Sequence, residues 1–586
     1  MLLMSKFYTA FAAAMIATAS FAQPQAKVQN AGSLAKGPVD TPIHIQLQKQ
    51  LPGSRQTNFR LPEYSSPAIP FAARAKKAAS APLIAEQPAG TLHANYYGTN
   101  SGYYVFFGYV LASSSDGTVE NFVEGDNGEV YIKDAMSTLR QGNWIKGQKT
   151  VGDTIAVELP QKYYVQDETD DDGNPTGDQE YFYLWRMKID DEGTSLIPDE
   201  ETQTIKYVLR NDSLIKVDDY DDGVIVGLAT EDGEWTGYGD FRNVSVKNTD
   251  TPVSLPASAV AQTYQLDFGD PATENTDARL VKVAFDGDDV YLGNLTDTNP
   301  DAWAKGKIDG DKVVFDGKQY LGIDEENSSH TYFAPAGKTQ VYDSYYDDMV
   351  DSIYFEKQTV FDFDAAAKTL KSDGSFLVNA GKKKLSYIAL YNKPQLKEWA
   401  NVPAAPKDPE IIDFMAYDEG YGYGGMQIYL EKTSVDGNLL DEKNLFYNIY
   451  FDGELFTFYP DEYIALKDEL TDVPYDFADS YDFYVDGASH TVYFYFTGFE
   501  TVGVQEIYRS EGKEYKSNLV TYDVDEEGNL TGINHAALSG DSAADVTGVS
   551  YTDISGRRIT NPTSGLYLKT VKFADGSQKT VKFVKR

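Results

Sequence analysis

The chain has 586 residues, of which 51 are Lys or Arg and 90 are Asp or Glu, so its formal net charge is −39. This charge argues against a nucleic-acid-binding protein, because such proteins need a basic face that displaces counterions from phosphates. The length suggests about three to five domains. Tyr (43) and Gly (48) are frequent and Met (8) is rare, which favours strands and tight turns over helices. We therefore predict an all-β protein.

The N-terminus has the features of a secretory signal peptide. One cation, Lys6, precedes an apolar stretch at 7–19, and small residues precede Gln23. Signal peptidase reads such small residues, and the apolar stretch is too short to span a bilayer. We predict a signal peptide over 1–22 that is cleaved between Ala22 and Gln23. The chain has no Cys, which excludes disulfides and a lipidated cysteine, and no later segment predicts a transmembrane anchor.

A proline-rich, basic stretch follows the predicted cleavage site. Eight of the 24 prolines lie between Pro38 and Pro88, and residues 27–92 hold eight cations against three acids. The stretch shows no hydrophobic periodicity, so we predict a flexible arm over 23–92. Residues 547–586 are basic too, with eight cations against two acids. The excess of acidic residues therefore lies in the body between the two ends.

The body consists of short alternating runs separated by turns of the Asp-Gly and Asn-Gly type, which predict antiparallel hairpins. Two examples are the hairpins expected at 280–295 and 303–315. The absence of long helical patterns argues against a parallel βαβ sheet and favours antiparallel meanders.

An internal repeat divides the first part of the body. The Val-Tyr pairs that begin at Val130 and Val290 are each followed by a tryptophan, Trp144 or Trp303, and then by Lys-Gly and Gly-Asp pairs. The repeat distance is domain-sized, so we predict two duplicated meander modules. Their expected boundaries are 93–250 and 258–400, and each module is either a barrel or a sandwich. We expect the two tryptophans to be packing residues.

A third domain is predicted at 409–524, after the proline-rich joint at 402–409. Its seven or so short strands have the size and rhythm of an immunoglobulin or fibronectin type III sandwich. A linker at 525–546 is expected to follow.

The last 40 residues carry motifs in a recognisable order: a turn with Asp553, Gly556, Arg557 and Arg558, a strand start with Gly565 and Tyr567, and a basic terminal strand with Lys582 and Lys585. This tail, 547–586, resembles the type A C-terminal sorting domain of proteins exported by the type IX secretion system. The resemblance implies the type IX secretion machinery as partner and passage through the periplasm to the cell surface or the medium. It implies no activity for the body.

Catalytic and metal motifs are scarce. The five histidines (His44, His93, His330, His490 and His535) show no metal-ligand spacing and are expected in solvated loops. No GxSxG motif supports a serine hydrolase. We therefore predict no catalytic residue and no cofactor other than calcium.

Two acidic loops could bind calcium. Glu168, Asp170 and Asp172 precede a glycine at alternate positions, and so do Asp523, Asp525 and Glu527. This spacing lets a turning loop converge oxygen ligands, but neither loop has the closing Glu of an EF-hand. Weak calcium sites and solvated acidic hairpin loops both remain open.

Tyrosine pairs along the strands place some rings in solvent, where they could stack on sugars or anchor a protein. We therefore expect a secreted or cell-surface protein with a binding, adhesion or structural role, and a glycan or a host or surface protein as partner. The alternative is an extracellular hydrolase of glycan or protein. That alternative requires two carboxylates in an aromatic-lined cleft.

Overall fold

In the computed structural model of the protein, the described residues are 81–586 without 107–108, 170–174, 191–194, 218–223, 270–275, 344–347, 419, 421, 480, 526–527, 529, 537–545, 554–557, 560–564, 574–577 and 586. These residues form strands, two short 3-10 turns (η3, Asp126–Gly128, and η4, Glu442–Asn444) and no α-helix. The all-β prediction is confirmed. Among the described residues, no helix reaches the length and hydropathy that a membrane span requires.

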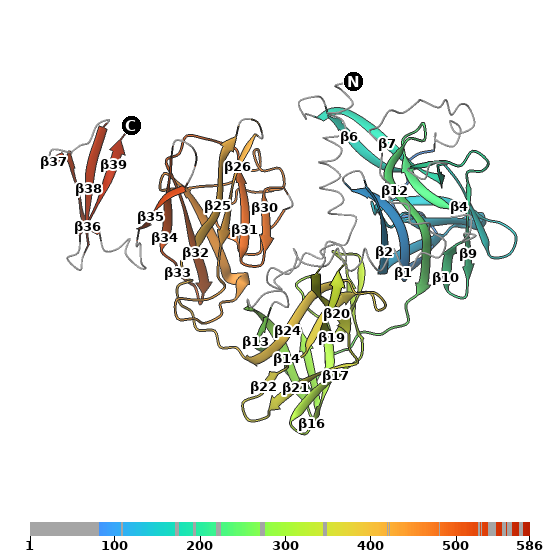
Figure 1. The fold of residues 1–586 in the computed structure, drawn as a ribbon, viewed down its shortest axis with the longest axis horizontal. Helices are drawn as coiled ribbons and strands as arrows, with labels where there is room; N and C mark the ends of the chain where they lie inside the picture. Colours follow the sequence, from blue (N-terminus) through green and yellow to red (C-terminus); the bar gives the residue numbers. More distant parts are fainter. Residues whose placement is uncertain are drawn as a thin grey trace. The chain divides into compact units, whose positions relative to one another are not determined.

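Contacts divide the chain after Trp399 into two compact units. The first unit contains strands β1 to β24 (Figure 1).

Strands β1 to β12 make up the first module. Eight of them pair in a closed antiparallel ring, in the order β1-β2-β3-β4-β5-β9-β10-β12, with β12 returning to β1. The strands are β1 (Thr91–Phe106), β2 (Tyr109–Glu124), β3 (Glu129–Lys133), β4 (Trp144–Lys149), β5 (Thr154–Glu158), β6 (Gln161–Thr169), β7 (Pro175–Ile189), β8 (Leu196–Pro198), β9 (Thr204–Arg210), β10 (Ser213–Lys216), β11 (Ile225–Ala229) and β12 (Trp235–Lys247).

Strands β13 to β24 repeat this topology in the second module. The closed ring here is β13-β14-β15-β16-β17-β21-β22-β24, with β24 returning to β13. The strands are β13 (Gln262–Gly269), β14 (Thr276–Asp286), β15 (Asp289–Gly293), β16 (Trp303–Asp309), β17 (Lys312–Asp316), β18 (Gln319–Asp324), β19 (Ser329–Asp343), β20 (Asp348–Phe355), β21 (Gln358–Asp364), β22 (Thr369–Lys371), β23 (Ser375–Ala380) and β24 (Tyr387–Glu398).

Both rings carry the same additional strands on one side. In the first module β11 pairs with β7 and β12, and β7 pairs with β6 and β8. In the second module β23 pairs with β19 and β24, and β19 pairs with β18 and β20. Each module is therefore an eight-stranded barrel with a small sheet that continues from its last strand.

Turn chemistry and apolar alternation explain the barrel of the second module. Its predicted hairpins form as β14–β15 and β16–β17, and Gly287 and Gly310 in their turns have positive φ angles of 61° and 65°. This conformation suits glycine because it has no Cβ. Alternate residues of the strands fill one hydrophobic core that includes Val283, Val313 and Phe361. Such a filled interior is normal for a barrel of this strand number.

The second unit contains a β-sandwich. One sheet has the order β25-β26-β31-β30 and the other β28-β27-β32-β34-β35, and residues of both sheets share one core. The strands are β25 (Glu410–Asp418), β26 (Tyr423–Tyr429), β27 (Leu445–Phe451), β28 (Glu454–Leu455), β29 (Val473–Pro474), β30 (Phe483–Asp486), β31 (Ser489–Phe494), β32 (Thr501–Ser510), β33 (Lys513–Lys516), β34 (Leu519–Val524) and β35 (Leu530–Ala536).

Strand β35 lies inside the segment 525–546 that we expected to be a linker. It pairs with β34 from Leu519 to Val524, so the sheet extends further along the chain than the sequence indicates. The tail forms a separate antiparallel sheet in the order β37-β36-β38-β39, made by β36 (Val546–Asp553), β37 (Arg558–Ile559), β38 (Gly565–Phe573) and β39 (Gln578–Lys585).

Candidate functional site

A polar groove of about 560 Å³ opens in the second module, where the small sheet leaves the barrel. It is lined by residues in the middle of β19 and β24, at the start of β21 and β23 and at the end of β22. Its volume falls within the range of ligand pockets, about 300–1,000 Å³. None of the described residues that line it is aromatic.

The floor of the groove consists of small polar side chains. Thr359, Ser372 and Ser375 are buried, and Asn392 is half-buried. The hydroxyl of Thr359 donates to the Ser375 carbonyl oxygen (2.9 Å), that of Ser372 to the Val360 carbonyl oxygen (2.7 Å), and that of Ser375 to Oδ1 of Asn392 (2.9 Å). Each hydroxyl has a single hydrogen, so the three oxygens offer lone pairs to a ligand.

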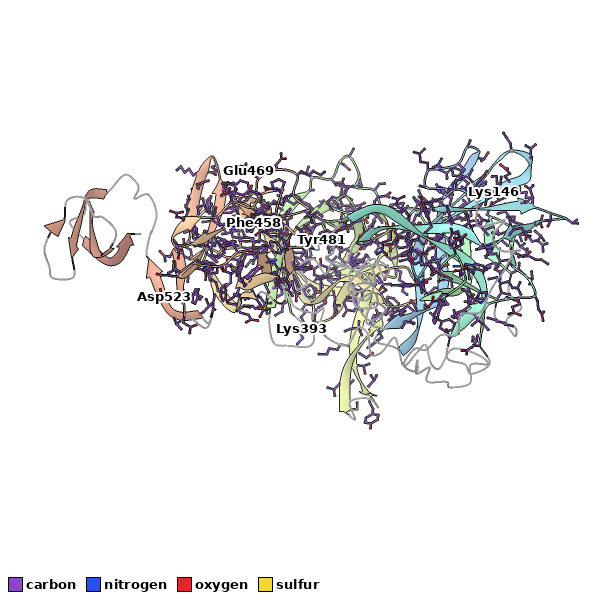
Figure 2. The ribbon with its side chains drawn as sticks, turned by 90° about the horizontal axis from the view of Figure 1, so that it is seen from above. Lys146, Lys393, Phe458, Glu469, Tyr481 and Asp523 are labelled. Carbon is purple, nitrogen blue, oxygen red and sulfur yellow. The ribbon has the colours of Figure 1, made fainter. Side chains whose placement is uncertain are left out.

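The rim of the groove carries both signs of charge. Its acidic residues are Glu356, Asp362 and Asp373, and its basic residues are Lys338, Lys371 and Lys393. All six are exposed. Lys393, on β24, is labelled in Figure 2. The rim therefore has no net formal charge.

The duplicated topology makes it possible to compare this groove with the same place in the first module. The side chains of Gln161 and Gln319 fix the register, because each bonds both the backbone N–H and the carbonyl of an equivalent lysine, Lys146 or Lys305. From these residues, the paired positions on neighbouring strands can be matched between the modules along two routes. One route runs through β9 and β10, and the other runs through β7 and β11. Both routes give the same equivalence for β12 and β24.

This register shows that the first module fills the space that is open in the second. Large side chains in the first module stand where the second has small ones: Met187, Ile205, Lys216, Ile225 and Phe241 are equivalent to Ala336, Thr359, Ser372, Ser375 and Asn392.

Lys216 is the most informative member of this set. Its side chain is 4% exposed, and Nζ donates to the carbonyl oxygens of Val224 and Asp240, both at 3.1 Å. The long side chain in the first module thus crosses the space that Ser372 leaves open in the second. The groove therefore arises from small polar substitutions in a shared backbone framework.

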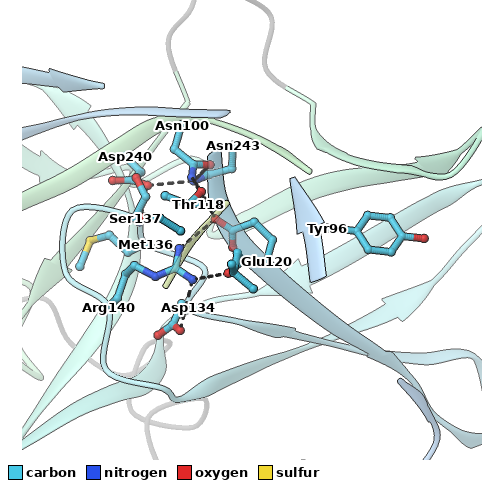
Figure 3. A network of polar contacts seen from close by, with 12 residues as sticks. Tyr96, Asn100, Thr118, Glu120, Asp134, Met136, Ser137, Arg140, Asp240 and Asn243 are labelled. Carbon is cyan, nitrogen blue, oxygen red and sulfur yellow. Dashed lines mark hydrogen bonds and ion pairs between the residues drawn. The ribbon is translucent and has the colours of Figure 1, made fainter. Parts of the chain in front are cut away.

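A buried polar network in the first module is a second candidate site (Figure 3). Arg140 donates to Oε1 of Glu120 (2.9 Å) and to the Val119 carbonyl oxygen (2.6 Å), and it lies 3.7 Å from Asp134. Burial alone would lower the pKa of Arg140, but the carboxylates of Glu120 and Asp134 outweigh it and raise that pKa.

The other carboxylate of the network also binds the loop before β4. Asp240 is fully buried and accepts hydrogen bonds from the backbone N–H groups of Ser137 and Thr138 and from the Thr138 hydroxyl. Asn243 donates to the second oxygen of Asp240 (2.8 Å). Because protein donors occupy these carboxylates, the network fastens the loop to the barrel and offers no reactive group.

The second module contains an ion pair of opposite polarity between the equivalent strand and loop, two residues away along the strand. Arg279, on β14, lies 3.1 Å from Asp297 in the loop before β16. In the first module the acid is on the strand and the arginine is in the loop; here the two are exchanged. A reversed pair that joins the same two elements supports a structural role for both.

The two modules of the first unit meet at His330, which is fully buried. Its Nε2 lies 3.1 Å from the Tyr96 carbonyl oxygen, and Nδ1 lies 2.8 Å from the Tyr320 hydroxyl and 3.1 Å from the Asn248 amide nitrogen. These partners assign a neutral ring with its proton on Nε2. Burial lowers the pKa of His330 below its usual 6.5. The prediction of solvated loop histidines is therefore wrong for His330, and also for His490, which is fully buried in the sandwich.

The structure describes only part of the predicted calcium loops. Glu168 belongs to β6, Asp523 lies on β34, and the Asp525 carbonyl oxygen accepts from the Gly528 N–H (3.0 Å). Asp170, Asp172 and Glu527 lie outside the described residues. Within the described residues, no group of three or more His, Cys, Asp or Glu is placed to hold a metal. Calcium binding stays a prediction.

The predicted export residues are also described only in part. Ala22, Gln23, Gly556 and Arg557 lie outside the described residues. In the backbone of the tail, Asp553 pairs with Tyr567, Gly565 pairs with Lys585, Leu568 pairs with Lys582, and Arg558 pairs with Thr552. No protein-family model matches the chain, and no curated protein matches it at a significant level.

Sequence reasoning missed the groove, although its residues are visible in the printed sequence. A signal existed in the repeat marked by Trp144 and Trp303. When the two copies are aligned through every strand, Lys216 is equivalent to Ser372. The packing role expected for the two tryptophans is confirmed for Trp144, which is 3% exposed.

Proposed function

We propose that the chain is an exported, non-catalytic binding protein that takes its ligand in the groove of the second module. One observation carries this proposal: two modules share a topology, and the place that large side chains fill in the first is open and polar in the second. Concave sites with a few converging polar groups are typical ligand sites. The partner classes are a glycan and a host or surface protein.

Export rests on the two ends of the chain. The apolar N-terminal stretch resembles a signal peptide, and the tail resembles a type IX sorting domain. Deletion of residues 547–586 should retain the protein in the periplasm of a host that has this machinery, whereas the intact chain reaches the surface or medium. Equal surface amounts of the two forms, measured by fractionation and immunoblot, would contradict the export proposal.

The sandwich of the second unit fits the same proposal as an immunoglobulin-type module. Its sheet orders β25-β26-β31-β30 and β27-β32-β34 support this assignment, because an immunoglobulin constant-type domain has the orders A-B-E-D and C-F-G. This fold hosts many unrelated functions, so it names no ligand by itself.

The binding proposal is tested with a glycan and surface-protein array probed with the full chain. Ser372→Lys introduces the residue of the first module and should fill the groove. Ser254→Lys, at an exposed position, is the charge-matched control. The proposal expects at least one ligand that the wild type and Ser254→Lys bind and Ser372→Lys does not. Identical array profiles for all three proteins would refute a ligand site in the groove.

A further inference from the structure

The first module shows what chemistry the groove accommodates. In the space equivalent to the groove it places a primary ammonium, Nζ of Lys216, on the carbonyl oxygens of Val224 and Asp240. An ammonium has three donors and no acceptor, so it requires oxygen lone pairs around it. The backbone of this region is shared by the two modules, because the strand registers agree.

The floor of the groove offers the same kind of partner. The hydrogens of the Thr359, Ser372 and Ser375 hydroxyls are committed to acceptors in the protein. Ser372 also accepts from the Gly374 N–H (3.1 Å), which leaves its oxygen one further lone pair. These three hydroxyl oxygens can accept a further hydrogen bond but cannot donate one, so they match a donor group of a ligand. A phosphate, sulfate or carboxylate would place acceptor against acceptor at these three hydroxyls, and on the floor only the Asn392 amide has N–H groups to offer it.

The rim does not select a ligand by charge alone. Three carboxylates (Glu356, Asp362 and Asp373) and three lysines (Lys338, Lys371 and Lys393) line the opening. One of these acids, Asp362, already pairs with Lys312. The chain as a whole is strongly acidic, with a net charge of −39, and this favours the approach of cations. Selection therefore depends on the floor, and the overall charge assists the encounter.

We infer that the groove binds a primary ammonium group carried on a short aliphatic or sugar framework. The sources of this chemistry are a lysine side chain of a protein and an amino sugar. The inference rests on the proposed function, since it names the ligand class of the same groove.

The test uses the full chain and two pairs of soluble probes that differ in one charge. The first pair is Nα-acetyl-lysine methylamide and its Nε-acetylated form, and the second is glucosamine and N-acetylglucosamine. Calorimetric titration should detect binding of at least one ammonium probe. Its acetylated partner should bind at least about tenfold more weakly or not at all. The pair that responds identifies the source.

Two variants tie any binding to the groove. Ser372→Lys should abolish ammonium binding, because its own ammonium occupies the floor, whereas Ser254→Lys, with the same charge change, should keep wild-type affinity. If Ser372→Lys lacks the wild-type unfolding transition, Ser375→Val replaces it. That variant removes one acceptor oxygen, and the first module has the apolar Ile225 at the equivalent position; it should weaken binding several-fold.

Three results would overturn the inference: no binding of either ammonium probe, equal binding of the acetylated partners, or undiminished binding by the groove variants. The proposed function fails separately. If the array finds a ligand that Ser372→Lys loses while both ammonium probes fail, the groove is a ligand site for another chemistry. If no array ligand depends on Ser372, the proposed function itself falls.

Discussion

Replacement of Arg140 by Met should destabilise the first module strongly. The guanidinium bonds Oε1 of Glu120 (2.9 Å) and the Val119 carbonyl oxygen (2.6 Å). The Glu120 side chain is 10% exposed, so the substitution leaves a buried carboxylate without its counter-ion. Loss of one partner of a buried ion pair costs about 3–5 kcal/mol.

The structure places the expected cost at the lower end of that range. Glu120 keeps two donors after the substitution, the amide nitrogen of Asn100 (3.0 Å) and the hydroxyl of Thr118 (2.6 Å). We therefore expect the free energy of unfolding of the first module to fall by about 3 kcal/mol. Urea unfolding of the full chain measures it, with tryptophan fluorescence as the probe, since Trp144, Trp185 and Trp235 lie in this module.

A second substitution separates the contribution of the ion pair to stability from the contribution of side-chain packing. Glu120→Gln removes the charge that Arg140→Met leaves unpaired, so the double variant should be more stable than Arg140→Met alone. Strictly additive losses would contradict a coupled pair. A loss below about 1 kcal/mol in Arg140→Met would refute the reasoning, because that is the range of an exposed ion pair.

Three further predictions follow from buried groups. The folded state disfavours protonation of His330. The free energy of unfolding should therefore be highest above the usual histidine pKa of 6.5 and should decrease as the pH falls below 6.5, by up to about 1.4 kcal/mol per pH unit. The same pH dependence in His330→Gln, measured by urea unfolding, would contradict this. The Glu506 carboxyl is fully buried with no hydrogen-bond partner among the described residues, and burial raises its pKa well above 4.5. Folding therefore takes up a proton at neutral pH, and the stability of the second unit falls as the pH rises. Glu506→Gln should raise the unfolding midpoint of this unit at pH 8. An unchanged midpoint at pH 8 would argue against a buried, protonated Glu506. At the contact between the modules, a Cβ on Gly381 would lie 2.3 Å from the Asp116 carbonyl oxygen, whereas a Cβ on Gly310 would meet open space. Gly381→Ala should therefore lower the melting temperature more than Gly310→Ala. Equal decreases would show that only the positive φ angle matters.

Much of the local structure could be predicted because turn residues fix it. The glycines at 287 and 310 mark hairpins whose strands pair directly across the turn. Closure of the barrels could not be predicted, because it depends on pairs distant in sequence. One example is Thr154 with Val208, which no turn connects and which an inserted β6–β8 segment separates.

The groove was missed in the sequence for a related reason. Its floor is gathered from β21, the segment between β22 and β23, the start of β23, and β24, so no single segment displays it. In the printed sequence, Ser372 and Ser375 flank Asp373 and Gly374 and have the composition of an ordinary turn. His330 was misjudged for a similar reason, because only the contact between modules buries it.

The most direct test of the account is to label the full chain with an alkylamine that carries a photoreactive diazirine and to map the labelled peptides by mass spectrometry. An ammonium site in the groove predicts label on the residues that line it, 336–338, 356, 358–360, 362, 371–375 and 392–393, in the wild type and in Ser254→Lys. It predicts loss of that label in Ser372→Lys. Label spread over acidic surfaces to the same extent in all three proteins would contradict it.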